Sequence, residues 1–308
     1  MTLLVFGGTG FVGSSIIKRC KYKEKIISFS SKKVEIISSN KKKKINYNLS
    51  IDYINKQKKI DAIFCAATRY DPKKYRAKPE IVFNNNIKSI LKFIKTIDAA
   101  YKKVSKILII SSYAVYGDTL KDNSENSILS TENFSKREFN YAFAKYIQEK
   151  LIINFCKEKN IKYNIIRLPS IYGPGSTLNK KNAHVVPSFI LQILKNRKNM
   201  NVYGTGNEKR EFIYIYDLIK IIIKLRKVNY SDIINVGSNK LISIKNLLKN
   251  IISLTNSSIL AKFNNESFSD VPIRKVNYRK FNTLFKGFRF TNISSGLNET
   301  IKWYKEKL

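Results

Sequence analysis

Short apolar runs alternate along the chain with segments whose apolar residues recur at helical spacing. The first run, residues 3–6, is unbroken, as is typical of a strand buried on both faces of a sheet. A turn rich in glycine follows, and the apolar positions of residues 11–17 return at the period of a helix. We expect further strands at residues 25–30, 61–68 and 106–110. Strands that alternate with helices predict a parallel sheet covered on both faces, with ligands at the carboxyl ends of its strands.

The turn after the first strand carries regularly spaced glycines. Gly7, Gly10 and Gly13 lie three residues apart, and Gly8, Gly10 and Gly13 also fit the pattern G-x-G-x-x-G. Such glycines allow a tight turn and let a pyrophosphate approach the backbone, while the following helix N-terminus offers free N–H groups. The alternative is a turn of small residues without a ligand, which the buried strand before it disfavours. We expect a dinucleotide site formed by Gly7, Thr9, Gly10, Phe11, Val12 and Gly13.

The loop after the second strand bears on which dinucleotide binds. An NAD site usually has an acidic residue about 20 positions after the glycines, where it binds the ribose 2′-hydroxyl. That place holds Ser30, Ser31, Lys32 and Lys33 instead. Hydroxyl and ammonium groups suit a 2′-phosphate better than a bare diol, so we expect NADP(H) to be favoured, with NAD(H) possible. Because lysine is frequent everywhere in this chain, the missing acid is the stronger of the two arguments.

Small and amide side chains mark the next segments. Three asparagines at 84–86 precede an amphipathic helix at residues 87–97, and we expect one of them to cap its N-terminus. The strand at residues 61–68 ends with Ala66 and Ala67, which allow a cofactor to lie close to the backbone. Ala66 and Ala67 are therefore candidate cofactor contacts.

Three residues form a candidate catalytic set. Ser112 stands at the end of a buried strand, and Tyr141 and Lys145 lie four residues apart, hence on one face of a helix. A phenol has an ordinary pKa near ~10 and is a poor base at neutral pH. A neighbouring ammonium, and the nicotinamide cation of an oxidised cofactor, lower that pKa. Tyr-x-x-x-Lys alone arises by accident in a chain rich in both residues, but its combination with the glycine turn and the serine strand end predicts a catalytic set.

Composition and charge narrow the class of protein. A chain of 308 residues with 43% hydrophobic content can bury a large core and is not disordered. The net charge of +36 suggests nucleic-acid binding, yet most basic residues are lysines spread over the whole length. That distribution indicates a compositional bias rather than a binding footprint, and we interpret the one tight lysine run, residues 41–44, as a solvated loop. We expect no nucleic-acid partner, and a positive field that attracts anionic metabolites.

The cysteines and the apolar runs bear on location. Cys20, Cys65 and Cys156 lie far apart among apolar residues, without the spacing of metal ligands. We expect buried, reduced thiols and no metal site. The N-terminus lacks the charged segment and cleavage site of a signal peptide. No apolar run approaches the length of a membrane span, since residues 219–225 are already interrupted by two lysines. The sequence predicts a soluble, cytoplasmic protein without a membrane partner.

Together these motifs resemble the extended short-chain dehydrogenase/reductase family, specifically its NAD(P)-dependent nucleotide-sugar epimerases, dehydratases and reductases. The resemblance covers nearly the whole chain. It rests on GGTGFVG at 7–13, DAIFCAAT at 61–68, the region of Asn86, SSYAVYG at 111–117, YAFAK at 141–145, RLPSIYGPG at 167–175, VYGTGNEKREFIYIYDL at 202–218, INVGS at 234–238 and SSGLNETIKWY at 294–304.

The resemblance implies a fold and roles for several residues. Ser112, Tyr141 and Lys145 match the family's catalytic Ser/Thr, Tyr and Lys, and Lys145 would also hold the nicotinamide ribose. Asn86 and Pro169 match further cofactor positions. The implied architecture is α/β, a Rossmann-type doubly wound parallel sheet with a smaller C-terminal α/β substrate lobe. Residues 1–167, with a return segment at about 211–236, would form the dinucleotide-binding domain, and residues 168–210 and 237–308 the substrate lobe.

The resemblance also implies a nucleotide-diphosphate sugar as substrate. Arg210 matches the family's arginine that grips the diphosphate, for which a two-pronged guanidinium is suited, and Arg274 is a second candidate. His184 lies in a stretch similar to the Ser-His-Val-Ile-Pro segment of GDP-L-fucose synthase, whose histidine is an acid/base in epimerisation. Asp217 is expected to position its segment rather than to touch substrate. By analogy alone, a homodimer through the helices around Asn86 and Tyr141 is possible.

Departures from the family's patterns limit the reaction. Ala114 stands where GDP-L-fucose synthase has a cysteine, which disfavours C3/C5 epimerisation. Tyr113 and Ala114 replace the Asp-Glu pair of the sugar 4,6-dehydratases, so dehydration lacks its acid and base. Two activities stay open: a 4-ketoreductase, and a 4-epimerase, both with Tyr141 as acid/base. A non-catalytic dinucleotide sensor or scaffold is the alternative, and it would not require the intact Ser/Tyr/Lys set.

Overall fold

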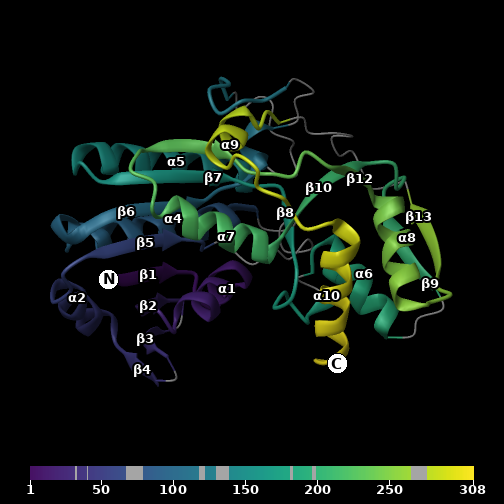
Figure 1. Ribbon diagram of the computed structural model, residues 1–308, viewed down its shortest axis with the longest axis horizontal. Helices are drawn as coiled ribbons and strands as arrows, with labels where there is room; N and C mark the ends of the chain where they lie inside the picture. The colour runs from purple at the N-terminus through teal and green to yellow at the C-terminus, as the bar shows by residue number, and fades with distance from the viewer. Residues whose placement is uncertain are drawn as a thin grey trace.

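The computed structural model describes residues 1–31, 33–39, 41–66, 79–117, 122–129, 139–180, 183–195, 199–264 and 276–308. Lys32, Ala67 and Arg274, three residues that the sequence assigns to the site, lie outside these ranges. The ribbon shows a larger part built around one sheet and a smaller part beside it, formed from the C-terminal half of the chain (Figure 1).

An eight-stranded sheet forms the centre of the larger part. Its strands are β1 (Thr2–Phe6), β2 (Lys25–Phe29), β3 (Val34–Ser38), β4 (Lys41–Ile45), β5 (Ile60–Phe64), β6 (Val104–Ile110), β7 (Lys162–Arg167) and β11 (Asp232–Asn235). They follow the order β11-β7-β6-β5-β1-β2-β3-β4. All neighbours from β11 to β2 are parallel, whereas β3 is antiparallel to both β2 and β4. The expected α/β, Rossmann-type sheet is therefore confirmed, with an added hairpin at one edge.

The strand side chains alternate between two apolar layers, because successive residues of a strand point to opposite faces. Leu3 and Val5 of the fully buried β1 pack in the layer of helices α1 (Phe11–Cys20) and α7 (Ile215–Leu225). Leu4 and Phe6 pack in the opposite layer, whose helices are α2 (Tyr47–Asn55), α4 (Pro79–Asp98) and α5 (Phe139–Glu158). The unbroken apolar run at residues 3–6 thus serves both faces of the sheet.

The smaller part is also α/β. It contains the three-stranded sheet of β8 (Ser170–Tyr172), β10 (Lys209–Tyr214) and β12 (Leu241–Ser243), the strand pair of β9 (Asn199–Tyr203) and β13 (Leu260–Asn264), and the helices α6 (Val185–Leu194), α8 (Ile244–Thr255) and α10 (Ile293–Lys305). The short helices η1 (Tyr101–Lys103), η2 (Tyr113–Tyr116) and α9 (Arg279–Leu284) complete the assignment. β1 runs from the marked N-terminus toward the smaller part, so the carboxyl ends of the parallel strands face it (Figure 1).

A buried carboxylate connects α10 to the larger part. Asp217 on α7 is 1% exposed. It accepts hydrogen bonds from the backbone nitrogen of Thr291, at 2.7 Å, and from the Thr291 hydroxyl, at 3.0 Å. Thr291 lies two residues before α10, so Asp217 holds the start of α10 against α7, whereas the sequence led us to expect that it positions its own segment.

Two local predictions are wrong. Residues 41–44 form the exposed edge strand β4 rather than a solvated loop. An edge strand needs partners on one side only, and its lysines extend into solvent. The asparagines at 84–86 lie inside α4, which begins at Pro79, and so do not cap it. Proline is favoured in the first turn of a helix, where its missing N–H is not required.

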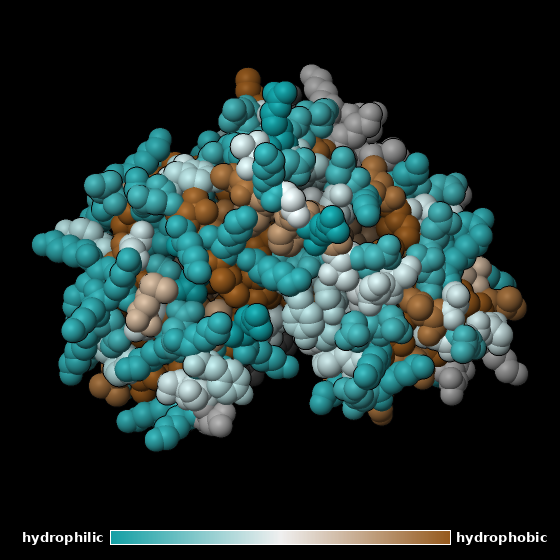
Figure 2. All heavy atoms as spheres, viewed as in Figure 1, coloured by the Kyte–Doolittle hydropathy of each residue, from teal (hydrophilic) through white to brown (hydrophobic). Residues whose placement is uncertain are grey.

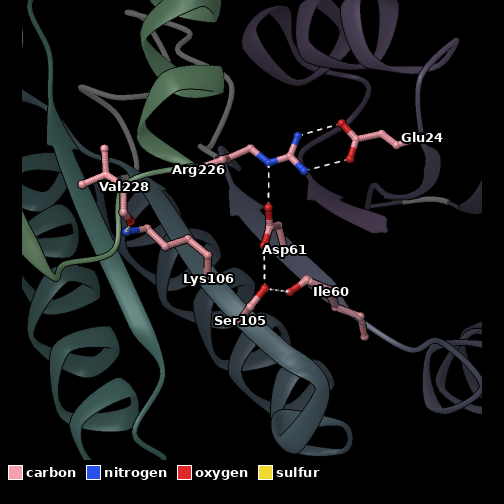
Figure 3. Close-up of polar contacts among 7 residues, drawn as sticks. All are labelled: Glu24, Ile60, Asp61, Ser105, Lys106, Arg226 and Val228. Atoms are coloured by element: carbon pink, nitrogen blue, oxygen red, sulfur yellow. Dashed lines mark hydrogen bonds and ion pairs between the residues drawn. The ribbon is translucent and has the colours of Figure 1, made fainter.

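A cluster of charged groups fastens the end of the sheet that lies away from the carboxyl ends of the strands (Figure 3). Arg226, at the end of α7, donates two hydrogen bonds to Glu24, at 2.7 and 2.8 Å, and one to Asp61, at 2.9 Å. The hydroxyl of Ser105 donates to the other oxygen of Asp61 at 2.8 Å. Beside it, the ammonium of Lys106 donates to the carbonyl of Val228 at 2.8 Å. α7 is thereby anchored to the strands beneath it.

Polar residues are distributed widely over the visible surface. Hydrophilic side chains are spread over both parts of the visible face, without gathering over a single element (Figure 2). Among the described residues, no helix combines the length and apolar character that a bilayer crossing requires.

Candidate active site

The glycine turn is too tight for side chains at Gly7 and Gly13. Gly7 has φ of +92°, and its carbonyl accepts from the nitrogen of Gly10 at 2.9 Å. A Cβ on Gly13 would lie 2.3 Å from the Gly7 oxygen, and one on Gly7 would lie 2.8 Å from the nitrogen of Ala66. The turn therefore excludes side chains and lies against the end of β5. Such a cradle at the N-terminus of α1 fits a dinucleotide pyrophosphate.

The other predicted residues of this turn differ in their exposure to solvent. Thr9 and Gly10 are exposed, while Phe11 and Val12 at the start of α1 are partly buried. Ala66 is partly buried beside Gly7. Gly10 is the N-cap of α1 and has no side chain that could accept a hydrogen bond from the first N–H groups of the helix.

The loop after β2 differs from the expectation of free hydroxyl and ammonium groups. The Ser30 hydroxyl donates to the Lys33 carbonyl at 3.0 Å and accepts from the Lys33 nitrogen at 3.2 Å. The Lys33 ammonium forms an ion pair with Glu35 at 2.9 Å. Ser30 and Lys33 thus already have partners in the chain, which weakens their part of the argument for NADP, while Lys32 lies outside the described residues. Sequence reasoning missed Glu35 because it lies on the next strand, β3.

The segment that carries Ser112 is aligned by the neighbouring strand end. The nitrogen of Ser111 donates to the carbonyl of Ile166 at 2.8 Å, and the nitrogen of Tyr113 donates to that of Leu168 at 2.9 Å. Ser112 stands between them, partly buried, at the N-cap of η2, where its hydroxyl accepts from the nitrogen of Ala114 at 3.1 Å. The predicted cofactor residue Pro169 follows Leu168 directly and is therefore at the same end of the sheet.

Lys145 brings α5 to this strand end. Its ammonium donates to the carbonyl of Ile110 at 3.0 Å, two residues before Ser112. Lys145 is 3% exposed, and burial lowers its pKa to about 8, although the nearby Cys65 and Glu149 raise it. The Lys145 ammonium is therefore mostly charged at neutral pH and loses its proton above about pH 8. A buried cation at this point favours anions beside it.

Tyr141 lies one helical turn before Lys145 on α5. It is partly buried and packs in a small apolar cluster with Ala114 and Ala142. Ala114 belongs to the segment that starts at Ser112, so the structure brings Ser112, Tyr141 and Lys145 together at the carboxyl end of β6. This is the arrangement that their spacing in the sequence predicts.

A buried ion pair lies one helical turn beyond Lys145 and was not predicted from the sequence. Glu149, one turn after Lys145, accepts two hydrogen bonds from Arg167, at 3.1 and 2.8 Å. It also accepts from the hydroxyl of Ser111 at 2.5 Å. The guanidinium of Arg167 lies 4.8 Å from the ring centre of Tyr116. The signal that could have found the pair is the four-residue spacing from Lys145 to Glu149 together with an arginine at the end of β7.

The two residues that follow Ser112 are not suited to act as an acid or a base toward a substrate. Tyr113 and Ala114 are buried, at 5% and 4% exposure. The Tyr113 hydroxyl donates to that of Tyr278 at 3.2 Å, and Tyr278 donates in turn to Glu211. Burial raises the pKa of Glu211, while the hydrogen bond from Tyr278 lowers it. Tyr113 therefore belongs to a buried cluster that ties the Ser112 segment to β10.

The remaining predicted site residues lie further from the catalytic set or have other partners. Asn86 is completely buried inside α4, where its amide donates to the carbonyl of Val82 at 2.8 Å. Arg210, on β10, is partly buried and donates to the carbonyl of Lys209 at 2.9 Å. His184 is the exposed N-cap of α6.

These features define a dinucleotide-binding α/β protein with a Ser/Tyr/Lys constellation beside the glycine turn. The chain belongs to the NAD dependent epimerase/dehydratase family, whose model matches residues 3–237. Among curated relatives, it is 30% identical over 218 residues to a UDP-N-acetyl-alpha-D-glucosaminuronate decarboxylase of Bacillus cytotoxicus, with 68% of this chain and 67% of the relative covered.

Solved structures share the fold over the whole length. A UDP-N-acetylglucosamine 4-epimerase from Methanobrevibacter ruminantium, in complex with UDP-N-acetylmuramic acid, has a TM-score of 0.80 and 26% identity, with 100% of this chain and 99% of that chain covered. A UDP-glucuronic acid 4-epimerase from Bacillus cereus, in complex with UDP-glucuronic acid and NAD, has a TM-score of 0.78 and 18% identity, with both chains fully covered. The fold is therefore that of the nucleotide-sugar epimerases.

Proposed function

We propose that this chain catalyses hydride transfer at C4 of a nucleotide-diphosphate sugar, as a 4-epimerase with bound NAD. The observation that supports this function best is the buried Lys145 ammonium, held 3.0 Å from the Ile110 carbonyl. This anchor places a cation one turn from Tyr141 and at the strand end that carries Ser112. The membership of the family and the 26% identical epimerase structure support the same reaction.

In the proposed mechanism the chain supplies proton transfer and positioning. Tyr141 removes the proton from the C4 hydroxyl, and Ser112 donates a hydrogen bond to the same oxygen. The charge of Lys145 stabilises the Tyr141 phenolate that accepts this proton, and its ammonium would hold the nicotinamide ribose. Bound NAD supplies reversible hydride acceptance at C4. The 4-keto sugar then presents its other face, and Tyr141 returns the proton to the oxygen.

The smaller part would hold the nucleotide-diphosphate sugar. We assign Arg210 and Arg274 to the diphosphate, because guanidinium groups bind phosphate oxygens in pairs. His184 is assigned to the sugar side, at the N-terminus of α6. The parallel strands end toward this part of the molecule, which is where ligands of such sheets bind (Figure 1).

A decarboxylase is the second candidate, and the 30% identical relative favours it. The two reactions share C4 oxidation. In a sugar acid, the C4 ketone lies β to the carboxylate, so the bond to the carboxyl carbon can break with its electron pair accepted by the ketone and CO₂ released. A 4-ketoreductase would instead take NADPH as a consumed substrate.

Tyr141→Phe tests the proposed mechanism. We expect turnover of UDP-sugars, measured by separating the epimers, to fall by at least about 10²-fold, because the proton acceptor is lost. Tyr146→Phe, on the same helix, is the matched control and is expected to retain activity. Unchanged turnover in Tyr141→Phe would contradict the catalytic role.

The cofactor released from freshly purified protein, identified by absorbance and mass, separates the alternatives. Bound NAD⁺ at one equivalent together with epimer interconversion supports the 4-epimerase. An empty site that takes up NADPH supports the 4-ketoreductase. Release of CO₂ from a UDP-uronic acid supports the decarboxylase.

A further inference from the structure

The turn between β2 and β3 lies where the adenosine ribose of a dinucleotide would lie. The nitrogens of Gly7 and Gly8 donate to the Phe29 carbonyl at 2.8 and 3.1 Å. The end of β2 is therefore fixed against the glycine turn. In a dinucleotide site the residue that recognises the ribose 2′-position comes from this strand end.

Glu35, the second residue of β3, is the first acidic residue that follows this strand end. It pairs with Ser28 across β2 and β3, so both side chains lie on the same face of the sheet. The Ser28 hydroxyl in turn lies against the glycine turn, since a Cβ on Gly8 would come within 2.0 Å of it. Glu35 is thus one strand away from a residue that touches the turn, and it is 3% exposed.

Two lysines surround the Glu35 carboxylate. Lys33 lies 2.9 Å and Lys42 lies 3.2 Å from the same oxygen. The side chains of the lysines are 36% and 54% exposed, whereas that of Glu35 is 4% exposed. Burial alone would raise the pKa of Glu35, but the hydrogen bonds from Lys33 and Lys42 lower it overall. The carboxylate is therefore ionised at neutral pH.

We propose that Glu35 selects NAD over NADP by occupying the ammonium groups that a 2′-phosphate would require; this inference rests on the proposed function. A 2′-phosphate that recruited Lys33 would compete with Glu35 and leave a buried carboxylate with fewer partners, which is unfavourable. A ribose diol carries no charge and needs no such exchange. The acid that the loop at residues 30–33 lacks is therefore supplied indirectly, from the neighbouring strand.

Titration calorimetry of the apoprotein with NAD⁺ and with NADP⁺ tests this assignment. Wild type is expected to bind NAD⁺ more tightly. Glu35→Gln keeps the size of the side chain and frees two solvent-exposed lysines, so the ratio of the two dissociation constants is expected to shift about tenfold toward NADP⁺. Thermal unfolding confirms that this variant is folded.

Two further variants serve as controls. Asp52→Asn makes the same change of net charge on the exposed face of α2 and is expected to leave the ratio unchanged. Glu35→Gln combined with Lys33→Gln is expected to lose most of the gain, since the freed ammonium is removed. A wild-type preference for NADP⁺, or an unchanged ratio in Glu35→Gln, would overturn the assignment of Glu35 alone. Absence of binding for both dinucleotides would overturn the proposed function as well.

Discussion

Glu149 and Arg167 form a charged pair one helical turn beyond Lys145, the proposed catalytic lysine. Both side chains are almost completely buried, at 1% and 3% exposure. Two charges at such depth lose much hydration, and the loss is offset only because they form two hydrogen bonds with each other and a third with Ser111. The intact pair therefore adds little to the free energy of unfolding, but removal of one partner leaves the other as a buried charge without a counter-charge.

Glu149→Gln is expected to lower the free energy of unfolding by about 3–5 kcal/mol, because it leaves the Arg167 guanidinium buried without a counter-charge. Chemical unfolding at neutral pH measures this loss. Glu158→Gln, the same substitution at an exposed position of α5, should change the free energy by less than about 0.5 kcal/mol. Equal losses in the two variants would contradict the role of burial.

The residues of the catalytic set could be predicted from the sequence because local spacing determines their arrangement. Tyr141 and Lys145 share a helix face, and Ser112 follows a buried strand, so the sheet topology alone brings them together. Asn86 could not be placed in this way, since its burial depends on how α4 packs against α5. Glu35 could not be found either, because its ion pairs depend on the strand conformation of β4, whose lysine run carries no apolar pattern.

The β3–β4 hairpin shows how a lysine run can be regular structure. β4 contributes four consecutive lysines to the last position of the sheet, where one side of the strand has no neighbouring strand. Lys42 and Lys44 lie on the face of Glu35, and Lys41 and Lys43 lie on the opposite face. Charged side chains on an edge strand oppose pairing with the edge of another molecule.

Replacing Lys41 and Lys43 by valine is expected to promote self-association. Valine favours the strand conformation, and the substitution removes two charges from an open edge while leaving Lys42 paired with Glu35. Sedimentation velocity over a range of protein concentrations measures the effect. Replacing Lys56 and Lys58, in the loop after α2, by valine makes the same change of charge away from the edge and should leave the protein's association unchanged.

The order of strands and helices could largely be predicted from the sequence, whereas the edge strand β4 could not. The apolar runs of β1, β5 and β6 are buried on both faces, so hydrophobicity alone identifies them. β4 has no apolar pattern, because its strand conformation comes from backbone pairing with β3. Single-residue hydrophobicity carries no information about such pairing.

At the scale of the whole molecule, Lys106 lies at the opposite end of β6 from the catalytic set. Its ammonium donates to the carbonyls of Val228 and Tyr230, both at 2.8 Å. Burial lowers the pKa of Lys106 to about 8, although Asp61 raises it. Between pH 8 and the ordinary lysine pKa, the unfolded chain therefore holds a proton that the folded chain has lost.

The free energy of unfolding is accordingly expected to rise with pH over this window, by at most about 3 kcal/mol from Lys106. Lys106→Met should reduce the rise, as measured by chemical unfolding at pH 7.5 and at pH 10. Lys102→Met, on the exposed surface nearby, should retain it. A rise that is the same in all three proteins would contradict the assignment to Lys106.

Because the chain is synthesised from its N-terminus, the contacts of Arg226 that anchor α7 can form only late in translation. The apolar face of β1 and β2 that α7 covers is built from residues near the N-terminus, and Glu24, the partner of Arg226, is made about two hundred residues before it. Until Leu225 has left the ribosome, this face lacks its second helix, and β7 lacks its neighbour β11. A nascent chain of this protein therefore exposes an apolar sheet face through most of its translation, and surfaces of this kind are prone to aggregation before folding is complete.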